Sequence, residues 1–323
     1  MGSPWVRARA PATIANVGPG FDVFALAIQG LGDAIAIRIS DEDSLRVEGP
    51  ESQSIPRDFD SNTAGIVLSA LRRMSGIRDP LEVRLSKGIP AGRGLGSSAA
   101  SCAAAALAFL KAYPRTKSLG AAGFIRAAVE GETAVAGRHF DNVSGALLGG
   151  FVSLASSQPL VLVREAVSPR IHIALAMPER EMRTAEMRKV LPRQVPVRDA
   201  VSNVGKAATL ALALTRGDVA LAGRCLEDRI AEPRRVPFLP GFEAARRAAL
   251  AAGAAGFALS GSGSSVFALA SSRRIAEQSA KAMRDAFGRV GISAKILATQ
   301  ADNSIPLRAA LRTPGPRFSL VTG

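Results

Sequence analysis

The chain has few of the residues from which disulfide or zinc frameworks are built. Only two cysteines occur in 323 residues, Cys102 and Cys225, and neither lies near a pair of histidines. Disulfide scaffolds need several cysteines, and structural zinc sites need four Cys or His ligands at short spacing. The sequence therefore excludes both frameworks and predicts that the two cysteines pack in the interior.

Long apolar runs without interruption are also missing. Residues 142–163 and 248–272 carry no charged side chain, which raises the question of a membrane span. Glycines and serines interrupt both stretches, and Pro159 interrupts the first, so we predict buried strands joined by turns. The first 11 residues contain no apolar segment of signal-peptide length. We therefore expect a cytoplasmic protein without a membrane partner.

Aromatic residues make up only 5% of the chain, although its net charge is +14. A strongly basic balance suggests nucleic-acid binding. However, the 34 arginines and seven lysines are spread along the chain without a block of five, and aromatic side chains for base stacking are scarce. We interpret the charge as a composition bias and predict no nucleic-acid partner, although a basic surface also attracts anionic nucleotides.

Two common nucleotide-binding motifs are missing as well. No G-x-x-x-x-G-K-[ST] string occurs, which excludes the P-loop class. The stretch "GRGLGSS" at 92–98 does not match the G-x-G-x-x-G fingerprint of a Rossmann fold, because its third glycine comes too early.

The hydrophobic pattern indicates two α+β halves. Residues 33–40 and 81–86 alternate like half-buried strands, and the amphipathic helix between them ends at Gly76. Further helices are predicted over 98–110 and roughly 120–136. After residue 168 strands and helices alternate again, with strands at 171–178 and 293–299. We expect the following organisation: a domain over 1–160, a second domain over 161–306 and a loosely held tail over 307–323.

A glycine-rich loop precedes the alanine-rich helix, in "GIPAGRGLGSSAAS" at 88–101. Gly92, Gly94 and Gly96 allow positive φ and a close approach of the backbone to a ligand. Ser97 and Ser98 begin a helix whose free N–H groups and dipole favour an anion, so the expected ligand is a phosphate. The Ser98 hydroxyl could also reach a Mg²⁺ that bridges phosphates. The alternative is a glycine-rich turn without a ligand.

This loop resembles the P-x-x-x-G-L-G-S-S-A phosphate loop of the GHMP kinases, a superfamily of small-molecule kinases. Two other superfamily motifs are similar to "APATIANVGPGFD" at 10–22 and "ALSGSGSSVFAL" at 258–269. The three motifs occur in the family's order over nearly the whole chain. The resemblance implies the two-domain α+β GHMP kinase fold, with an N-terminal domain like the second domain of ribosomal protein S five and a ferredoxin-like C-terminal domain.

Four stretches are similar to the homoserine kinase family within this superfamily. They are "PATIANVGPGFD" at 11–22, "HFDNV" at 139–143, "TAEMRKVLP" at 184–192 and "EPRRVPFLPGF" at 232–242. The resemblance implies transfer of the γ-phosphoryl group of Mg·ATP to the hydroxyl of L-homoserine, giving O-phospho-L-homoserine and ADP in threonine biosynthesis. Homodimers are common in the family, so the resemblance allows a homodimer, but the sequence does not show an interface.

For ATP and its metal, the resemblance implies a set of residues at and near the phosphate loop. They are Asn62, Lys87, Pro90, Gly92, Arg93, Gly94, Leu95, Gly96, Ser97 and Ser98, with Gly261, Ser262 and Gly263 in the second glycine loop. Asn62 would bond the adenine edge, although on its own it is typical of a helix N-cap. Ser98 and Glu132 are expected to hold Mg²⁺, with Glu130 as the alternative to Glu132.

Homoserine requires a site for its carboxylate, its ammonium and its hydroxyl. Arginine makes planar bidentate contacts with carboxylates, and the motifs supply Arg188 and Arg235, the latter selected over Arg234 by the E-P-x-R spacing. Without the motifs, each arginine would be interpreted as a surface charge.

The remaining polar motif positions would serve the ammonium and the hydroxyl. The residues that match are Asn16, Asp22, Asp141 and Asn142. Asp141 is also the candidate general base, with substrate binding as the alternative role. We expect His139 to order the site and His172, in an apolar strand, to be structural.

Two other functions stay open. A GHMP kinase for a different acceptor would share the three loop motifs, but an acceptor without a carboxylate would need neither Arg188 nor Arg235. A non-catalytic nucleic-acid-binding protein would tolerate the loss of Ser98 and Glu132, and its binding would fall steeply with salt.

Overall fold

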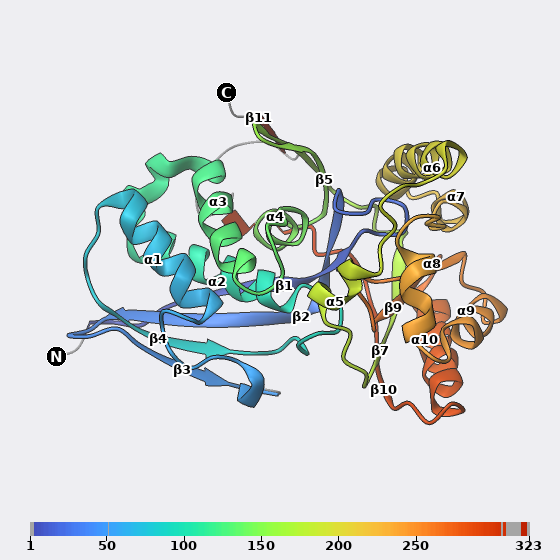
Figure 1. Cartoon of the computed structure of the whole chain (residues 1–323), viewed down its shortest axis with the longest axis horizontal. Coiled ribbons are helices and arrows are strands. Elements are labelled where there is room, and N and C mark those ends of the chain that lie inside the picture. Colours follow the sequence, from blue (N-terminus) through green and yellow to red (C-terminus); the bar gives the residue numbers. More distant parts are fainter. Residues whose placement is uncertain (1–2, 51, 305, 308–317, 322–323) are drawn as a thin grey trace.

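The computed structural model describes residues 3–50, 52–304, 306–307 and 318–321. Two β-sheets organise these residues, one of seven strands and one of four. Figure 1 shows the larger sheet with helices packed over one face, and the smaller sheet beside it with helices of its own. No helix within the described ranges is long and apolar enough to span a membrane.

The larger sheet is mainly antiparallel. Its strands are β1 (Val6–Ala15), β2 (Phe24–Ile39), β3 (Ser44–Glu48), β4 (Leu81–Ser86), β5 (Phe151–Ser157), β6 (Leu160–Glu165) and β11 (Phe318–Val321). They follow the order β11-β6-β5-β2-β4-β3, with β1 also paired to β2, and β3 lies parallel to β4. The strands predicted over 33–40 and 81–86 are confirmed as the end of β2 and as β4.

Four helices cover one face of this sheet (Figure 1). They are α1 (Thr63–Ser75), α2 (Ser97–Ala112), α3 (Gly120–Thr133) and α4 (Asp141–Leu148), with short 3₁₀ segments at Ser52–Ser54 and Pro114–Leu119. Helix α2 contacts the other three helices and strands β1 and β2, and its side chains from Ala99 to Leu110 are buried. Alanine forms helices well and is small, so this helix can be enclosed on all sides. Cys102 is buried in α2 and Cys225 is buried elsewhere, which confirms their predicted packing.

The prediction of strands throughout 142–163 was wrong for its first part, which forms α4. A short apolar run does not distinguish a buried strand from a buried helix by periodicity alone. Here Asp141 stands in the first helical turn, where a carboxylate favours the helix dipole, and Gly149 with φ 65° ends the helix.

The chain stays in the larger sheet beyond the domain boundary expected after residue 160, because β6 pairs with β5 as far as Glu165. The tail was also expected to be loosely held, yet residues 318–321 pair with β6 as the edge strand β11. Without β11, strand β6 would be the edge of the sheet, and its unpaired N–H and C=O groups would be available to pair with another strand. Residues 308–317 and 322–323 of the predicted tail lie outside the described residues.

The smaller sheet is fully antiparallel, in the order β10-β7-β9-β8. Its strands are β7 (His172–Pro178), β8 (Gly256–Leu259), β9 (Val266–Ala270) and β10 (Ala294–Thr299). One set of helices connects β7 to β8, and another helix connects β9 to β10. This is the β-α-β-β-α-β succession of a ferredoxin-like unit, which confirms the expected fold of the C-terminal half.

The helices of this half carry parts of the candidate site. They are α5 (Thr184–Lys189), α6 (Val197–Arg216), α7 (Val219–Arg224), α8 (Glu232–Arg235), α9 (Phe242–Ala251) and α10 (Arg273–Gly288), with a 3₁₀ turn at Val236–Phe238. In Figure 1, α5 lies between the two halves. Helices α9 and α10 pack against one face of the smaller sheet, and buried side chains of α6 and α7 belong to the cluster on its other face.

A shared apolar core joins the two sheets. Ile14 and Leu26 of the larger sheet belong to the same buried cluster as Leu175 and Phe267 of the smaller sheet. Burial of such side chains stabilises each by roughly 1.5 to 3 kcal/mol relative to exposure. Loops that come from opposite halves are therefore held in a fixed relation to each other.

Candidate active site

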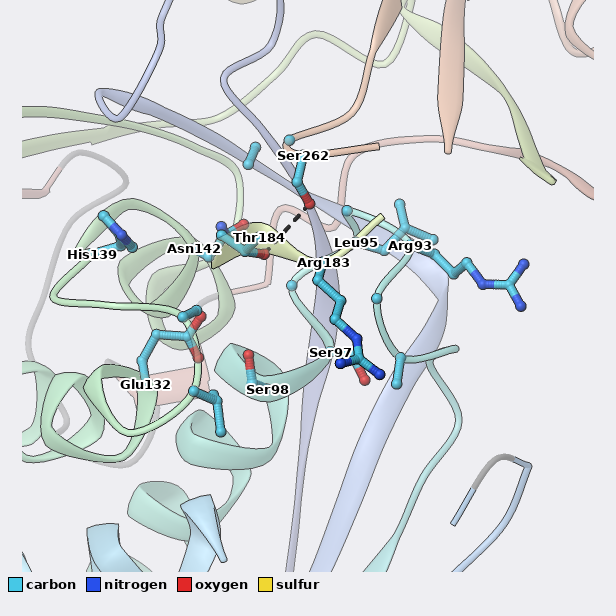
Figure 2. A pocket seen from close by; sticks show the side chains of 18 of the residues that line it. Arg93, Leu95, Ser97, Ser98, Glu132, His139, Asn142, Arg183, Thr184 and Ser262 are labelled. Carbon is cyan, nitrogen blue, oxygen red and sulfur yellow. Dashed lines mark hydrogen bonds between the residues drawn. The ribbon is translucent and has the colours of Figure 1, made fainter. Parts of the chain in front are cut away.

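A cleft of about 440 Å³ lies where the loops of both halves meet. Its walls come from the loop after β1, the glycine-rich loop before α2, the ends of α3 and α5, the start of α4, and the second glycine loop. Figure 2 shows Ser98, Glu132, Asn142, Thr184 and Ser262, which come from separate segments, around one cavity. Most motif residues singled out in the sequence therefore share one site.

The two glycine-rich loops touch each other directly. The Ser260 hydroxyl donates to the carbonyl of Gly94 at 2.6 Å, and a Cβ at Gly94 would lie 2.1 Å from the Ser260 carbonyl oxygen. Gly96 also has positive φ, and a Cβ there would lie 2.1 Å from the Thr13 hydroxyl. No larger residue fits at either position. Glycine is therefore required at both positions for the three motif segments to come together.

The start of α2 opens into this cleft. Gly96 is its N-cap, with φ 63°, and supplies no side chain to bond the first N–H groups of the helix. Ser97 donates its hydroxyl to the Ile89 carbonyl at 2.9 Å, while Ser98 points into the cavity (Figure 2). Unbonded N–H groups and the helix dipole make such a terminus a site for a phosphate.

Two buried carboxylates, Glu132 and Asp141, line the cleft. Burial raises the pKa of Glu132 to about 7, against a hydrogen bond from Ser98 that lowers it, and the Glu132 Oε2 atom has no partner. Burial, with the Asp22 charge adding to it, raises the pKa of Asp141 to about 6, and its Oδ1 atom also has no partner. Figure 2 shows Ser98 and Glu132 facing the same space.

This oxygen set fits a hard cation such as Mg²⁺, which takes one or two protein oxygens and keeps waters. The described residues contain no cluster of three or more Cys, His, Asp or Glu that would form a metal site alone. Of the two candidate glutamates, Glu132 lines the cleft. Glu130 lies on the exposed side of α3, where it pairs with Arg73 at 2.7 Å.

Two arginines meet at the other end of the cleft. Arg188 donates from Nη2 to Asp22 Oδ1 at 2.6 Å and lies 3.0 Å from His139 Nδ1. Burial and the Arg188 charge lower the pKa of His139, so its neutral ring can accept this bond. The Arg188 Nε atom is buried without a partner.

Arg235 is only 3% exposed, whereas its neighbour Arg234 is exposed. Its Nη1 atom donates to the Gly261 carbonyl at 2.8 Å, and Nε donates to the Met187 carbonyl at 3.4 Å. Burial, with the Arg188 charge adding to it, lowers the pKa of Arg235 to about 10. The E-P-x-R spacing favoured Arg235 over Arg234, and Arg235 is the one of the two that is buried.

The two candidate asparagines also line the cleft. Asn16 has φ 66° and accepts at Oδ1 from the Asp22 N–H at 3.3 Å. Asn142 accepts at Oδ1 from the Thr13 hydroxyl at 2.6 Å, next to Gly96. Asn142 is thus held by a residue of another motif segment, whereas the bond to Asn16 comes from within its own segment, 10–22.

Asn62 and Lys87 have functions inside the fold that the motifs alone did not specify. Asn62 is fully buried, accepts at Oδ1 from the Ala64 N–H at 2.9 Å as the N-cap of α1, and donates to the Pro56 carbonyl at 2.6 Å. The Lys87 ammonium donates to Asp33, to the Ser97 carbonyl at 2.9 Å and to the Ser101 hydroxyl at 2.8 Å. Lys87 therefore holds the first turn of α2 in place.

Asp33 was missed by the motif analysis. Its second carboxylate oxygen accepts from the Gly88 and Ile89 N–H groups at 2.9 and 3.2 Å, so it holds both Lys87 and the first residues of the phosphate loop. A signal was present: in the alternation of β2, Asp33 has the same parity as the core residues Ile35 and Ile37. A carboxylate on the core side of a strand needs a buried partner.

Asp228 and Glu232 were also missed as structural supports. Asp228 accepts from the N–H groups of Ile230, Ala231 and Glu232 at 2.8 to 3.0 Å, which fixes the start of the short helix α8. Glu232 accepts at Oε2 from the Leu259 N–H at 2.7 Å, directly before the second glycine loop. Both carboxylates therefore help to place Arg235.

Comparison with known proteins places these features in a family. Residues 62–150 match the GHMP kinases N terminal domain, and residues 210–289 match GHMP kinases C terminal. The chain is 41% identical over 298 residues to the homoserine kinase of Pyrococcus abyssi, a match that covers 91% of this chain and 96% of that protein. It is equally identical over 298 residues to the homoserine kinase of Thermococcus gammatolerans, with 92% and 98% covered.

A solved structure shows the same fold. The crystal structure of homoserine kinase from Cytophaga hutchinsonii superposes with a TM-score of 0.86 at 35% identity, covering 92% of this chain and 95% of that one. The arrangement of the two halves is therefore similar in both proteins.

Replacing Lys87 with methionine should destabilise the protein by about 3 to 5 kcal/mol, because Asp33 would stay buried without its cation. Urea unfolding measures this change. Arg73→Met, which removes the exposed pair with Glu130, is the control and should be nearly neutral. Equal effects of the two substitutions would contradict the buried support.

The pKa of Glu232, raised to about 7 mainly by burial, predicts a pH effect on stability. Because the folded state holds this proton more tightly than the unfolded state, the contribution is full below about pH 4.5 and is lost as the pH rises through about 7. Between about pH 5 and about pH 8, wild type should lose on the order of 2 kcal/mol more unfolding free energy than Glu232→Gln. The surface control Glu277→Gln should lose as much unfolding free energy over this pH range as wild type. If Glu232→Gln also loses as much as wild type, the assignment is refuted.

Proposed function

This chain belongs to the homoserine kinases, ATP-dependent small-molecule kinases of the GHMP superfamily, and from that premise we propose the reaction that its cleft performs. The γ-phosphoryl group of Mg·ATP is transferred to the hydroxyl of L-homoserine, giving O-phospho-L-homoserine and ADP. The observation that carries this proposal is the presence of two arginines in the same cleft as a helix start suited to phosphate. An acceptor without a carboxylate would have no use for these arginines.

At the nucleotide end, we propose that the phosphates lie against the N–H groups at the start of α2 and the loop over residues 92–98. Lys87 contributes through the position of that loop, because its ammonium is bonded to Asp33, Ser97 and Ser101. The adenine would lie against the wall that contains Ile55 and Pro56, which Asn62 holds in place.

Ser98 and Glu132 would hold Mg²⁺, with the unpartnered Glu132 oxygen directed at it. When bound, this ion neutralises charge on the phosphate oxygens. Burial raises the pKa of Glu132 to about 7, so the carboxyl group is about half protonated at neutral pH and would have to lose this proton in order to hold the ion.

At the acceptor end, the carboxylate of homoserine would contact Arg188 and Arg235. The unpartnered Nε of Arg188 supports this, because a buried N–H without an acceptor is costly and a bound carboxylate would satisfy it. Asp22 and Asn16 provide oxygens for the ammonium. His139 keeps the Arg188 guanidinium in the orientation that Asp22 also fixes.

The hydroxyl of homoserine would then lie between Asp141 and the γ-phosphate. Asp141 accepts the hydroxyl proton as the new O–P bond forms and the bond from γ-phosphorus to the ADP oxygen breaks. Phosphoryl transfer depends mainly on in-line positioning and charge neutralisation, and orientation alone can supply about 7 to 11 kcal/mol. The buried, unpartnered Oδ1 of Asp141 supports its part in this arrangement.

Purified protein with Mg·ATP should release ADP when L-homoserine is added, and not with mevalonate, shikimate or no acceptor. Arg235→Ala should lower kcat/KM for homoserine roughly ten- to hundredfold, mainly through KM, because a charged hydrogen-bond partner is lost. Arg234→Ala, which changes the exposed neighbour, should leave the KM unchanged. Turnover with another acceptor would overturn the substrate, and no turnover at all would favour a non-enzymatic role.

Asp141→Asn tests the role of this carboxylate. We expect kcat to fall at least a hundredfold while the KM for homoserine changes little, because general-base catalysis contributes about 10² to 10⁴. In wild type, kcat/KM should fall below about pH 6, where Asp141 becomes protonated. If Asp141→Asn keeps most of kcat and raises KM instead, Asp141 binds the substrate without acting as base.

A further inference from the structure

Phe21 connects the two arginines of the acceptor pocket. It lies in the loop between β1 and β2, and its side chain lines the cleft. The Arg188 guanidinium carbon lies 5.4 Å from the centre of the Phe21 ring, and that of Arg235 lies 5.2 Å from it. One aromatic ring therefore makes cation–π contacts with two arginines that come from separate helices, α5 and α8.

The two cations need such a partner because they are close enough to oppose each other's charge. Arg235 is almost fully buried, and the Arg188 charge disfavours its protonated form. Asp22 forms an ion pair with Arg188, whereas Arg235 donates its hydrogen bonds to the neutral carbonyl oxygens of Met187 and Gly261. An aromatic face attracts cations through its quadrupole, and guanidinium groups stack well on such faces. The ring thus offsets part of the repulsion without occupying the N–H groups that a ligand needs.

The loop that carries Phe21 is tightly constrained. A Cβ at Gly18 would lie 2.3 Å from the Leu226 carbonyl oxygen, so the loop lies directly against the C-terminal half. Asn16, Val17 and Asp22 all have positive φ, and for a β-branched valine this conformation is rare. Backbone strain of this kind persists where the surroundings fix the segment, and it clusters at functional sites. The position of the ring is therefore set by both halves of the protein.

We propose that Phe21 determines the selectivity of the pocket for a carboxylate-bearing acceptor, by holding the Arg188 and Arg235 guanidinium groups together on its ring. This proposal rests on the proposed function. Phe21 acts through the arginines, so it is a positioning residue and takes no part in the chemical step. Loss of the ring should weaken recognition of the carboxylate and leave the nucleotide site intact.

The chain offers a matched control. Two guanidinium groups also lie over the Trp5 ring, with the guanidinium carbon of Arg38 at 4.7 Å and that of Arg84 at 4.3 Å from the ring centre. Trp5 does not line the cleft. Trp5→Leu removes the same kind of contact from the larger sheet. It tests whether any loss of a ring between two arginines changes the kinetics.

The experiment compares two acceptors, L-homoserine and 3-aminopropan-1-ol, which has the same hydroxyl and ammonium but no carboxylate. The measured quantity is the ratio of their kcat/KM values in the full-length protein. Phe21→Leu should reduce this ratio roughly tenfold, with the KM for ATP changed less than twofold. Phe21→Tyr, which keeps the ring, and Trp5→Leu should keep the ratio of wild type. If Phe21→Leu does not fold, Phe21→Met provides the same test.

A ratio that stays at the wild-type value in Phe21→Leu or Phe21→Met would overturn the proposal. So would an equal loss of kcat/KM for both acceptors, because a purely structural role does not distinguish them. A reduction in Phe21→Tyr as large as in Phe21→Leu would also overturn it, since the ring would not be the cause. Failure of the proposed function is recognised separately, because wild type would then not phosphorylate homoserine.

Discussion

The close approach of the two glycine-rich loops is the constraint on which the site depends. Gly94 lies so near Ser260 that no side chain fits between them, and their hydrogen bond joins the two halves of the protein. The shared core beneath the loops keeps this contact in place. Because the glycine-rich loop at 92–98 belongs to the N-terminal half, and Arg188 and Arg235 belong to the C-terminal half, this contact fixes the distance between the proposed phosphate site and the proposed carboxylate site. Orientation of this kind is what phosphoryl transfer requires most from a protein.

Buried charge is distributed along the cleft in a consistent way. The unpartnered oxygens of Glu132 and Asp141 line the same cleft as the guanidinium groups of Arg188 and Arg235. Burial, with a neighbouring like charge adding to it, disfavours the charged form in each set, as the raised pKa of Glu132 and the lowered pKa of Arg235 indicate. Bound ligands of opposite charge relieve this cost, so the free site is less stable than the occupied one. Asp33 with Lys87 differs from both sets, because it is already paired and serves the loop alone.

Local signals in the sequence predicted much of this arrangement, and long-range contacts explain the rest. Glycine spacing identified a loop that lines the cleft, because positive φ and close approach of the backbone favour glycine over other residues. Helix α4 was mistaken for strand since a short apolar run has no decisive period. The pairing of β11 with β6 depends on residues far apart in the chain, which no local pattern encodes. For the same reason, the contacts of Phe21 with Arg188 and Arg235 became visible only in three dimensions.

A crystal structure with L-homoserine, Mg²⁺ and a non-hydrolysable ATP analogue would test the account most directly. It should show the γ-phosphate at the start of α2 and the homoserine carboxylate against Arg188 and Arg235. The acceptor hydroxyl should lie between Asp141 and the γ-phosphorus. A carboxylate bound away from both arginines, or phosphates bound away from the loop at 92–98, would contradict the central claim that the two glycine-rich loops build one phosphoryl-transfer site.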